Sequence, residues 1–248
     1  MDEWFDFDGR AVVVNGCGGI GREIVRAFAE RGARVVAADV DGVRAEAVAA
    51  ETDGVRPAEV DVRDGDAIRA VVDDAVGRLG GIDVLVNTAA VYVRVPALEL
   101  SEADFDRVMA INVKGTWLFC QAAGAHMTAR GSGRIVNYAS NAGLRGSALQ
   151  LAYNASKAAV ISLTKSLAVE WARSGVTVNA VAPGPTDTEL MAPAFIDEGT
   201  VRSFEARIPQ GALTPPDATV GPVLFLASDS ARWITGHTLF ADGGMSAT

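Results

Sequence analysis

Short apolar runs alternate with longer amphipathic stretches along most of this chain. The runs AVVVN, ARVVAADV and GVRPAEVDV are separated by stretches of helical periodicity, the second of which begins near Val43. In the first stretch Ile20, Ile24, Val25 and Phe28 share one face. Parallel strands need a crossover connection between them, and a helix is the usual one. The alternation therefore predicts a parallel sheet covered by helices on both faces.

The alternation continues to the C-terminus. Four further apolar runs follow, GIDVLVN, GRIVNYAS, GVTVNAVAPG and HTLFADGG, with one helical pattern that ends near His126 and one that spans residues 151–173. The runs total seven, and no linker divides them. We expect one α/β domain, residues 1–248, with a Rossmann-type, doubly wound, seven-stranded parallel sheet. Residues 185–216, rich in Pro, Thr and Gly, are expected to form a substrate lid within it.

Composition limits the partners of the chain. The formal net charge is −9, which disfavours nucleic acid and anionic membranes. Cys17 and Cys120 are far apart, and His126 and His237 have no partners at ligand spacing, so no metal site is predicted. No run of 18 apolar residues occurs, and the first residues lack the basic region of a signal peptide. We expect a cytoplasmic protein that binds neither nucleic acid nor a membrane.

The stretch VVVNGCGGIGRE predicts a nucleotide-binding turn between the first strand and the first helix. Gly16, Gly18 and Gly21 match G-x-G-x-x-G, whereas Gly16, Gly19 and Gly21 are one residue short of G-x-x-x-G-x-G. In the second alignment either Gly16 is the first glycine, or Asn15 replaces it, because Asn tolerates a left-handed backbone. Both alignments leave N–H groups at the helix N-terminus for a pyrophosphate.

A second pattern places acid/base chemistry on a later helix. Tyr153 and Lys157 are four residues apart, so their side chains share one helix face. A phenol has an ordinary pKa of ~10, which a nearby ammonium lowers, so Tyr153 is a candidate general acid/base. Ser140 stands thirteen residues before Tyr153, at the end of GRIVNYAS. A parallel sheet would deliver Ser140 to the carboxyl edge, where ligands bind.

With these motifs, the chain resembles the short-chain dehydrogenase/reductase family over nearly its full length. The resemblance rests on the turn at 15–21, Asp39, DV at 61–62, VLVNTAA at 84–90, INVKG at 111–115, the Ser140/Tyr153/Lys157 set, VNAVAPGPTDT at 178–188 and FLASDSARWITGHTLFADGG at 225–244. The sequence NTAA departs from the N-N-A-G that is usual in the family. The resemblance implies an oxidoreductase that transfers hydride to or from a nicotinamide cofactor.

The resemblance also implies roles for individual residues. Ser140 would hydrogen-bond the substrate oxygen, and Tyr153 would exchange a proton with it. Lys157 would tune the phenol and bind the nicotinamide ribose, and Asn112 would hold a water that leads to Lys157. The residues expected to hold the cofactor are Asn15, Gly16, Gly19, Ile20, Gly21, Asp39, Asp61, Val62, Asn87, Ala89, Tyr153, Lys157, Pro183, Gly184, Thr186 and Thr188.

Asp39 indicates the kind of nicotinamide cofactor. It stands eighteen residues after Gly21, near the ~20-residue offset at which a carboxylate binds the ribose 2′-OH. A carboxylate there repels the 2′-phosphate of NADP, and Val40 offers no compensating charge. NAD is therefore the expected cofactor.

The expected reaction interconverts a secondary alcohol and a ketone on a neutral small molecule, cyclic or polyhydroxylated. Expected substrate contacts are Tyr92, Ala142, Gln150 and Met191, beneath a lid whose apolar residues are Met191, Phe195, Ile196 and Phe204. Arg94 or Arg145, if turned inward, would instead bind a substrate carboxylate.

Two other functions stay open at this stage. A 3-oxoacyl-carrier-protein reductase shares the whole catalytic set, although it usually prefers NADP and needs a basic face for its acidic carrier. A cofactor-binding relative with weak catalysis is the other, because the glycine turn and NTAA depart from the family pattern. The resemblance also implies a homo-oligomer, a tetramer rather than a dimer. Leu163, Leu167 and Trp171, at helical spacing, form either a packing face or a subunit surface.

Overall fold

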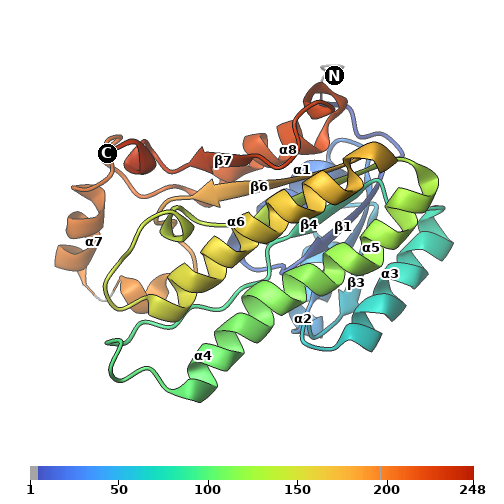
Figure 1. Ribbon diagram of the computed structural model, residues 1–248. Coiled ribbons are helices and arrows are strands. Elements are labelled where there is room, and N and C mark those ends of the chain that lie inside the picture. The colour runs from blue at the N-terminus through green and yellow to red at the C-terminus, as the bar shows by residue number, and fades with distance from the viewer. Residues whose placement is uncertain (1–4, 196) are drawn as a thin grey trace.

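Seven parallel strands form one sheet in the order β3-β2-β1-β4-β5-β6-β7 (Figure 1). The computed structural model describes residues 5–195 and 197–248. The strands are β1 (Ala11–Asn15), β2 (Arg34–Asp39), β3 (Val55–Glu59), β4 (Val84–Asn87), β5 (Gly133–Tyr138), β6 (Val176–Pro183) and β7 (Thr238–Ala241). Every neighbouring pair is parallel, which confirms the predicted Rossmann-type sheet.

Helices cover both faces of the sheet because its side chains are buried on both. Val12 and Val14 pack in a core cluster with residues of α1 and α8, whereas Ala11 and Val13 pack with residues of α3, α5 and α6. Figure 1 shows α5 and α6 in front of the sheet. The helices are α1 (Gly19–Ala29), α2 (Gly42–Ala50), α3 (Gly65–Leu79), α4 (Glu102–Met109), α5 (Thr116–Arg130), α6 (Leu151–Trp171), α7 (Glu198–Glu205) and α8 (Val220–Ala227). Within the described ranges, none of these helices has the length and hydropathy that a membrane span requires.

One helix boundary differs from the sequence expectation. The pattern predicted to end near His126 continues to Arg130, where Gly131 terminates α5 in a left-handed conformation (φ +78°). A π-helical turn, Ala110–Gly115, joins α4 to α5. His126 itself points toward α3, with its Nε2 3.0 Å from Asp73 Oδ1.

The segment expected to form a lid is closed at its base by main-chain hydrogen bonds. Thr214 N donates to Pro185 O (2.9 Å), and Asp187 N donates to Thr214 O (3.3 Å). The segment contains α7 and an edge-to-face contact between Phe195 and Phe204, with ring centroids 5.4 Å apart. Ile196, which the sequence also assigned to the apolar side of the lid, lies outside the described residues.

Candidate active site

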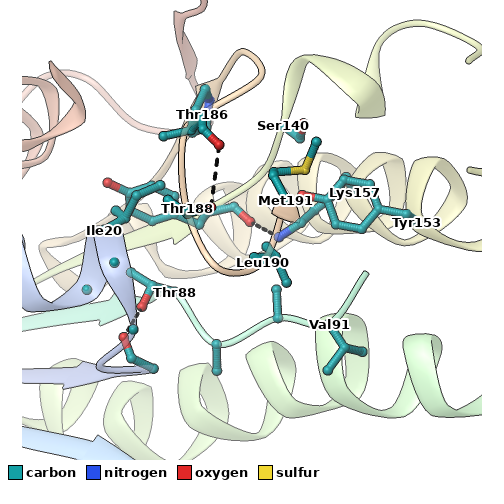
Figure 2. Close-up of a pocket in the computed structure, with 18 of the residues that line it drawn as sticks. Ile20, Thr88, Val91, Ser140, Tyr153, Lys157, Thr186, Thr188, Leu190 and Met191 are labelled. Atoms are coloured by element: carbon teal, nitrogen blue, oxygen red, sulfur yellow. Dashed lines mark hydrogen bonds between the residues drawn. The ribbon is translucent and has the colours of Figure 1, made fainter. Parts of the chain in front are cut away.

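A cleft of about 570 Å³ runs along the carboxyl ends of β1, β4, β5 and β6 (Figure 2). The strand order reverses between β1 and β4, where doubly wound sheets form their ligand crevice. The glycine turn lines one end of the cleft, beside Ile20 and Thr88, and Tyr153 and Lys157 line the other. These are named the turn end and the tyrosine end below. The residues 183–191 after β6 contribute to the wall between them.

Gly16 is the first glycine of the turn, and Asn15 is the last residue of β1. Gly16 has φ +84°, and a Cβ there would lie 2.5 Å from Ala89 N. A Cβ at Gly21 would lie 1.7 Å from Gly16 O, so both positions require glycine. The alternative in which Asn15 adopts a left-handed backbone is wrong. In the described part of the chain, Leu149 is the only non-glycine residue with positive φ.

The side chains of Asn15 and Asn87 are buried beneath the cleft. Asn15 Nδ2 donates to Asn87 Oδ1, Asn87 Nδ2 donates to Asn137 Oδ1 (2.8 Å), and Asn137 Nδ2 donates to Thr164 Oγ1 (3.0 Å). This chain of hydrogen bonds joins β1, β4, β5 and α6. Neither Asn15 nor Asn87 lines the cleft, so their buried amides join neighbouring strands, and the contact expected of them with a cofactor stays a prediction.

The N-terminus of α1 faces the turn end without a side-chain cap. Its N-cap is Gly18, whereas the carboxylates of Asp41 and Asp64 cap α2 and α3. The first turn of α1 also carries no acidic residue. Uncapped N–H groups and the helix dipole favour an anion such as a pyrophosphate. A Cβ at Gly19 would lie 3.0 Å from the Thr188 side chain, so the wall after β6 approaches this site closely.

Asp39 is held at the turn end by main-chain donors. Cys17 N donates to Asp39 Oδ2 (2.6 Å), and Asp41 N donates to Asp39 Oδ1 (3.0 Å). The carboxylate is buried and lines the cleft, where each oxygen keeps a lone pair for a hydroxyl group. Arg44, which the sequence reading missed, lines the same end. Its Nη2 lies 4.0 Å from Asp41 and 3.8 Å from Glu189, so acidic neighbours already balance its charge.

Asp61, Val62 and Ala89 complete the turn end. Hydrogen bonds from Arg63 hold the pKa of Asp61 below its usual value, so this carboxylate stays charged. A Cβ at Gly115 would lie 2.8 Å from the Val62 side chain, so the π-helical turn packs directly behind this wall.

Ser140, Tyr153 and Lys157 meet at the tyrosine end (Figure 2). Ser140 Oγ accepts a hydrogen bond from Ala142 N (3.2 Å), so its own proton can be donated to Tyr153 or to a ligand. A short 3-10 helix, Asn141–Gly143, follows Ser140 and packs on α6. A Cβ at Gly143 would lie 2.7 Å from the carbonyl carbon of Lys157. Gly143, another residue that the sequence reading missed, thus permits the approach of Ser140 to Tyr153.

Burial moves the two titrating groups in opposite directions. It raises the pKa of Tyr153 to about 12, with a smaller opposing effect from Ser140, and lowers the pKa of Lys157 to about 8. Lys157 Nζ lies 5.6 Å from the Tyr153 ring centroid and donates to Tyr138 O (2.8 Å). The net pKa of the phenol is therefore raised and not lowered as expected, because desolvation has the largest effect on Tyr153.

Asn112 ties the loop after β4 to α6. Its Oδ1 accepts from Val91 N (2.8 Å), and its Nδ2 donates to Val91 O (3.0 Å) and Ser156 Oγ (3.0 Å). Ser156 Oγ in turn donates to Tyr153 O (2.8 Å). Asn112 lies in the π-helical turn and outside the cleft lining, so the side chain positions the backbone near Tyr153. Its expected contact with a water stays a prediction.

Pro183, Gly184, Thr186 and Thr188 lie in the cleft wall where the sequence placed them. Thr186 Oγ1 donates to Gly184 O (3.0 Å), and Thr188 Oγ1 donates to Thr186 O (3.5 Å). A Cβ at Gly184 would lie 3.1 Å from Asp242 Cα, so this tight turn brings main chain to the cleft surface.

Three of the four expected substrate contacts line the tyrosine end: Ala142, Gln150 and Met191. Tyr92 does not line it, because its ring packs edge-to-face on Tyr153 with centroids 5.1 Å apart. Arg145 donates to Met245 O and so does not point freely into the cleft. The lining also includes residues outside the expected contacts, namely Ser147, Leu190, Phe204, Arg207 and Met245.

The cysteines and histidines form no reactive or metal-binding cluster. Burial raises the pKa of Cys17 and of Cys120 to about 12, which keeps both as thiols. Across residues 5–195 and 197–248, no group of three or more His, Cys, Asp or Glu side chains is arranged to hold a metal ion.

The chain is similar to known dehydrogenases and reductases over nearly its full length. A family model described as Enoyl-(Acyl carrier protein) reductase matches residues 16–246. D-threitol dehydrogenase of Mycolicibacterium smegmatis is 42% identical over 97% of this chain and 95% of that protein. NAD-dependent glycerol dehydrogenase of Listeria innocua is 37% identical over 98% and 96%.

A solved structure shows the same fold at similar identity. The gluconate 5-dehydrogenase of Burkholderia cenocepacia J2315, crystallised with NADP and tartrate, has a TM-score of 0.94 and 34% identity, and the match covers 99% of this chain and 98% of that one. With the Ser140, Tyr153 and Lys157 geometry, these similarities show that the chain belongs to the short-chain dehydrogenase/reductase family.

Proposed function

We propose that the protein interconverts a secondary alcohol and a ketone on a small polyhydroxylated molecule, with NAD(H) as cofactor. The proposal is based mainly on the arrangement of the cleft. Ser140, Tyr153 and Lys157 lie together at one end, and the glycine turn lies at the other. Two relatives are named as dehydrogenases of short polyols, D-threitol and glycerol, which supports this substrate class.

The chain supplies proton transfer and substrate orientation. When bound, the nicotinamide ring donates or accepts the hydride. Ser140 directs its free proton to the substrate oxygen, and Tyr153 gives a proton to a ketone or takes one from an alcohol. Because its pKa is about 12, Tyr153 is protonated near neutral pH, the form that ketone reduction needs. Lys157 uses one N–H on Tyr138 O and keeps two for ribose hydroxyls.

The cofactor is held by the two ends of the cleft. The close main-chain packing that Gly16 and Gly21 permit keeps the turn narrow, which suits the approach of a pyrophosphate to the uncapped α1 N-terminus. The buried Asp39 carboxylate suits ribose hydroxyls and repels a 2′-phosphate. Arg44 weakens that repulsion only in part, because Asp41 and Glu189 already pair with it. NAD is therefore the proposed cofactor, although the gluconate 5-dehydrogenase structure contains NADP.

The tyrosine end suits a neutral molecule with several hydroxyl groups. Ser147 and Gln150 line one part of it, while Leu190, Met191 and Met245 provide apolar surface. Arg145 is engaged by Met245 O, which removes one of the cations that a substrate carboxylate would use. An acyl-carrier protein is acidic, and a chain with a formal net charge of −9 repels it. The carrier-bound alternative is therefore not favoured.

Assembly into a homo-oligomer through α5 and α6 is also part of this proposal. Leu163, Leu167 and Trp171 are partly buried against the core of the monomer, so only part of each side chain is available to that surface. Trp117 on α5 and Val169 on α6 are instead exposed, with relative accessibilities of 40% and 83%. Large exposed apolar side chains of this kind are typical of subunit interfaces.

Replacing Tyr153 by Phe tests the proton-transfer role. Loss of the hydroxyl is expected to reduce kcat by about a hundredfold or more, because general acid/base catalysis contributes that much. The dissociation constant for NADH, followed by fluorescence, should stay close to that of the wild type. Tyr92→Phe is the matched control, since it removes a hydroxyl from the ring stacked on Tyr153 and should retain activity. A Tyr153→Phe enzyme within tenfold of wild-type kcat would contradict the role.

Replacing Lys157 by Met tests the effect of burial on its charge. The folded pKa of about 8 lies below the ordinary 10.5, so the folded state releases this proton first as pH rises. Below pH 8 the Lys157 amine is protonated in both the folded and the unfolded protein, so the folded protein is destabilised by the full cost of burying the charge. This destabilisation disappears as the pH rises toward 10.5, because the amine is then neutral in both states. Removing the ammonium should raise the unfolding free energy of the cofactor-free protein by about 1–2 kcal/mol at pH 7, after part of the gain is offset by the lost bond to Tyr138 O.

Urea denaturation of both proteins at pH 7 and pH 10 measures this gain. The difference between Lys157→Met and wild type should shrink strongly at pH 10, while activity is lost at both pH values. A gain of equal size at the two pH values would show that packing, not charge burial, is responsible.

Asp39 provides the test of cofactor choice. We expect kcat/KM with NAD to exceed that with NADP by at least about tenfold, because the 2′-phosphate would face a buried carboxylate. Asp39→Ser combined with Val40→Arg should shift the preference toward NADP. Asp41→Asn, which keeps a cap on α2, is the control and should leave NAD preferred. Equal efficiency of the wild type with the two cofactors would refute the assignment.

A further inference from the structure

The last residues of the chain turn back over the tyrosine end. After β7, Gly243 and Gly244 adopt left-handed conformations (φ +64° and +88°), and a 3-10 turn, Met245–Ala247, follows. The C-terminus therefore lies near α7 at the carboxyl edge of the sheet (Figure 1). Met245 is the member of this segment that lines the cleft.

Met245 is hydrogen-bonded to the turn that follows Ser140. Arg145 Nη1 donates to Met245 O, and Asn141 Nδ2 lies 3.2 Å from Met245 Sδ as a donor. Thr248 Oγ1 adds a third donor, to Met245 O (3.2 Å). Among the ion pairs of the described residues, none includes Arg145. The guanidinium is therefore directed at the C-terminal segment and not at a carboxylate of the protein.

The opposite side of the segment packs on residues that follow α7. Gln210 N donates to Gly243 O (3.1 Å), and a Cβ at Gly243 would lie 2.6 Å from Ile208 Cγ2. These contacts involve main chain and the close fit of glycine, and they do not hold the Met245 side chain. On the cleft side, Asn141 holds the Met245 sulfur and Arg145 holds the Met245 main chain.

We propose that Arg145 is a positioning residue that holds Met245 as a wall of the tyrosine end and thereby limits the length of the substrate. This inference rests on the proposed function. A methionine side chain is flexible, so a defined wall requires that its backbone be anchored. Met245 then supplies apolar surface to the cleft, as Met191 does, while Gln150 offers an amide to substrate hydroxyls. Arg145 acts through Met245 and does not bind the substrate.

The test compares Arg145→Ala, Arg145→Lys and Met245→Ala with wild type on linear polyols from glycerol to sorbitol and on gluconate. Arg145→Ala should raise KM for the best polyol by about tenfold while kcat changes little, since only binding contacts are loosened. The preference should move toward longer polyols, and Met245→Ala should produce the same shift. Arg145→Lys should restore most of the selectivity because it keeps a donor. Arg202→Ala, at an exposed arginine of α7, is the control and should behave as wild type.

Hydrogen exchange at residues 243–248 provides a readout that does not depend on activity. Exchange at Met245 and Ala247, whose N–H groups bond Asp242 O and Gly244 O, should accelerate in Arg145→Ala but not in Arg202→Ala. If wild type binds NAD but oxidises no polyol, the proposed function fails, and the exchange data still decide whether Arg145 anchors the segment. A KM increase confined to gluconate would overturn the inference, because Arg145 would then bind a substrate carboxylate directly. Unchanged exchange and unchanged selectivity in Arg145→Ala would overturn it as well.

Discussion

Main chain packs directly on main chain at both ends of the cleft, and the rest of the site depends on these two contacts. At the turn end, a Cβ on Gly21 would lie 1.7 Å from Gly16 O, so only glycine lets α1 start this close to β1. At the tyrosine end, Gly143 allows the turn after Ser140 to lie against the backbone of Lys157. The first contact directs uncapped N–H groups into the cleft, and the second brings a hydroxyl beside Tyr153.

Burial around the tyrosine end is the largest influence on the pKa values of Tyr153 and Lys157. Desolvation favours the neutral form of both Tyr153 and Lys157, although the ammonium lies over the phenol ring. The protonated phenol is ready to protonate a ketone, whereas alcohol oxidation requires the phenolate. The site without a cofactor thus favours the acid form of Tyr153, and the hydrogen bond with Ser140 opposes this preference only in part.

The strand and helix pattern was readable from the sequence because parallel strands buried on both faces are continuous apolar runs. The meeting of Ser140, Tyr153 and Lys157 could be predicted because their spacing and order match the family. Side-chain direction was not readable. Asn15 and Asn87 carry polar groups beside the turn, yet they bond each other beneath it, since Asn15, Asn87 and Asn137 share one register position on adjacent strands. Arg44 and Gly143 act through contacts between segments distant in sequence, which spacing does not reveal.

In the proposed reaction a hydride moves between a secondary carbinol carbon of a polyol and NAD, and Tyr153 moves the proton. This transfer can be followed by incubating the enzyme with NAD and a polyol that carries deuterium on its secondary carbinol carbons. Mass spectrometry of the NADH formed should show one deuterium from the substrate, and Tyr153→Phe should form essentially none of this product. NADH without deuterium, or equal formation by Tyr153→Phe, would rule out this reaction.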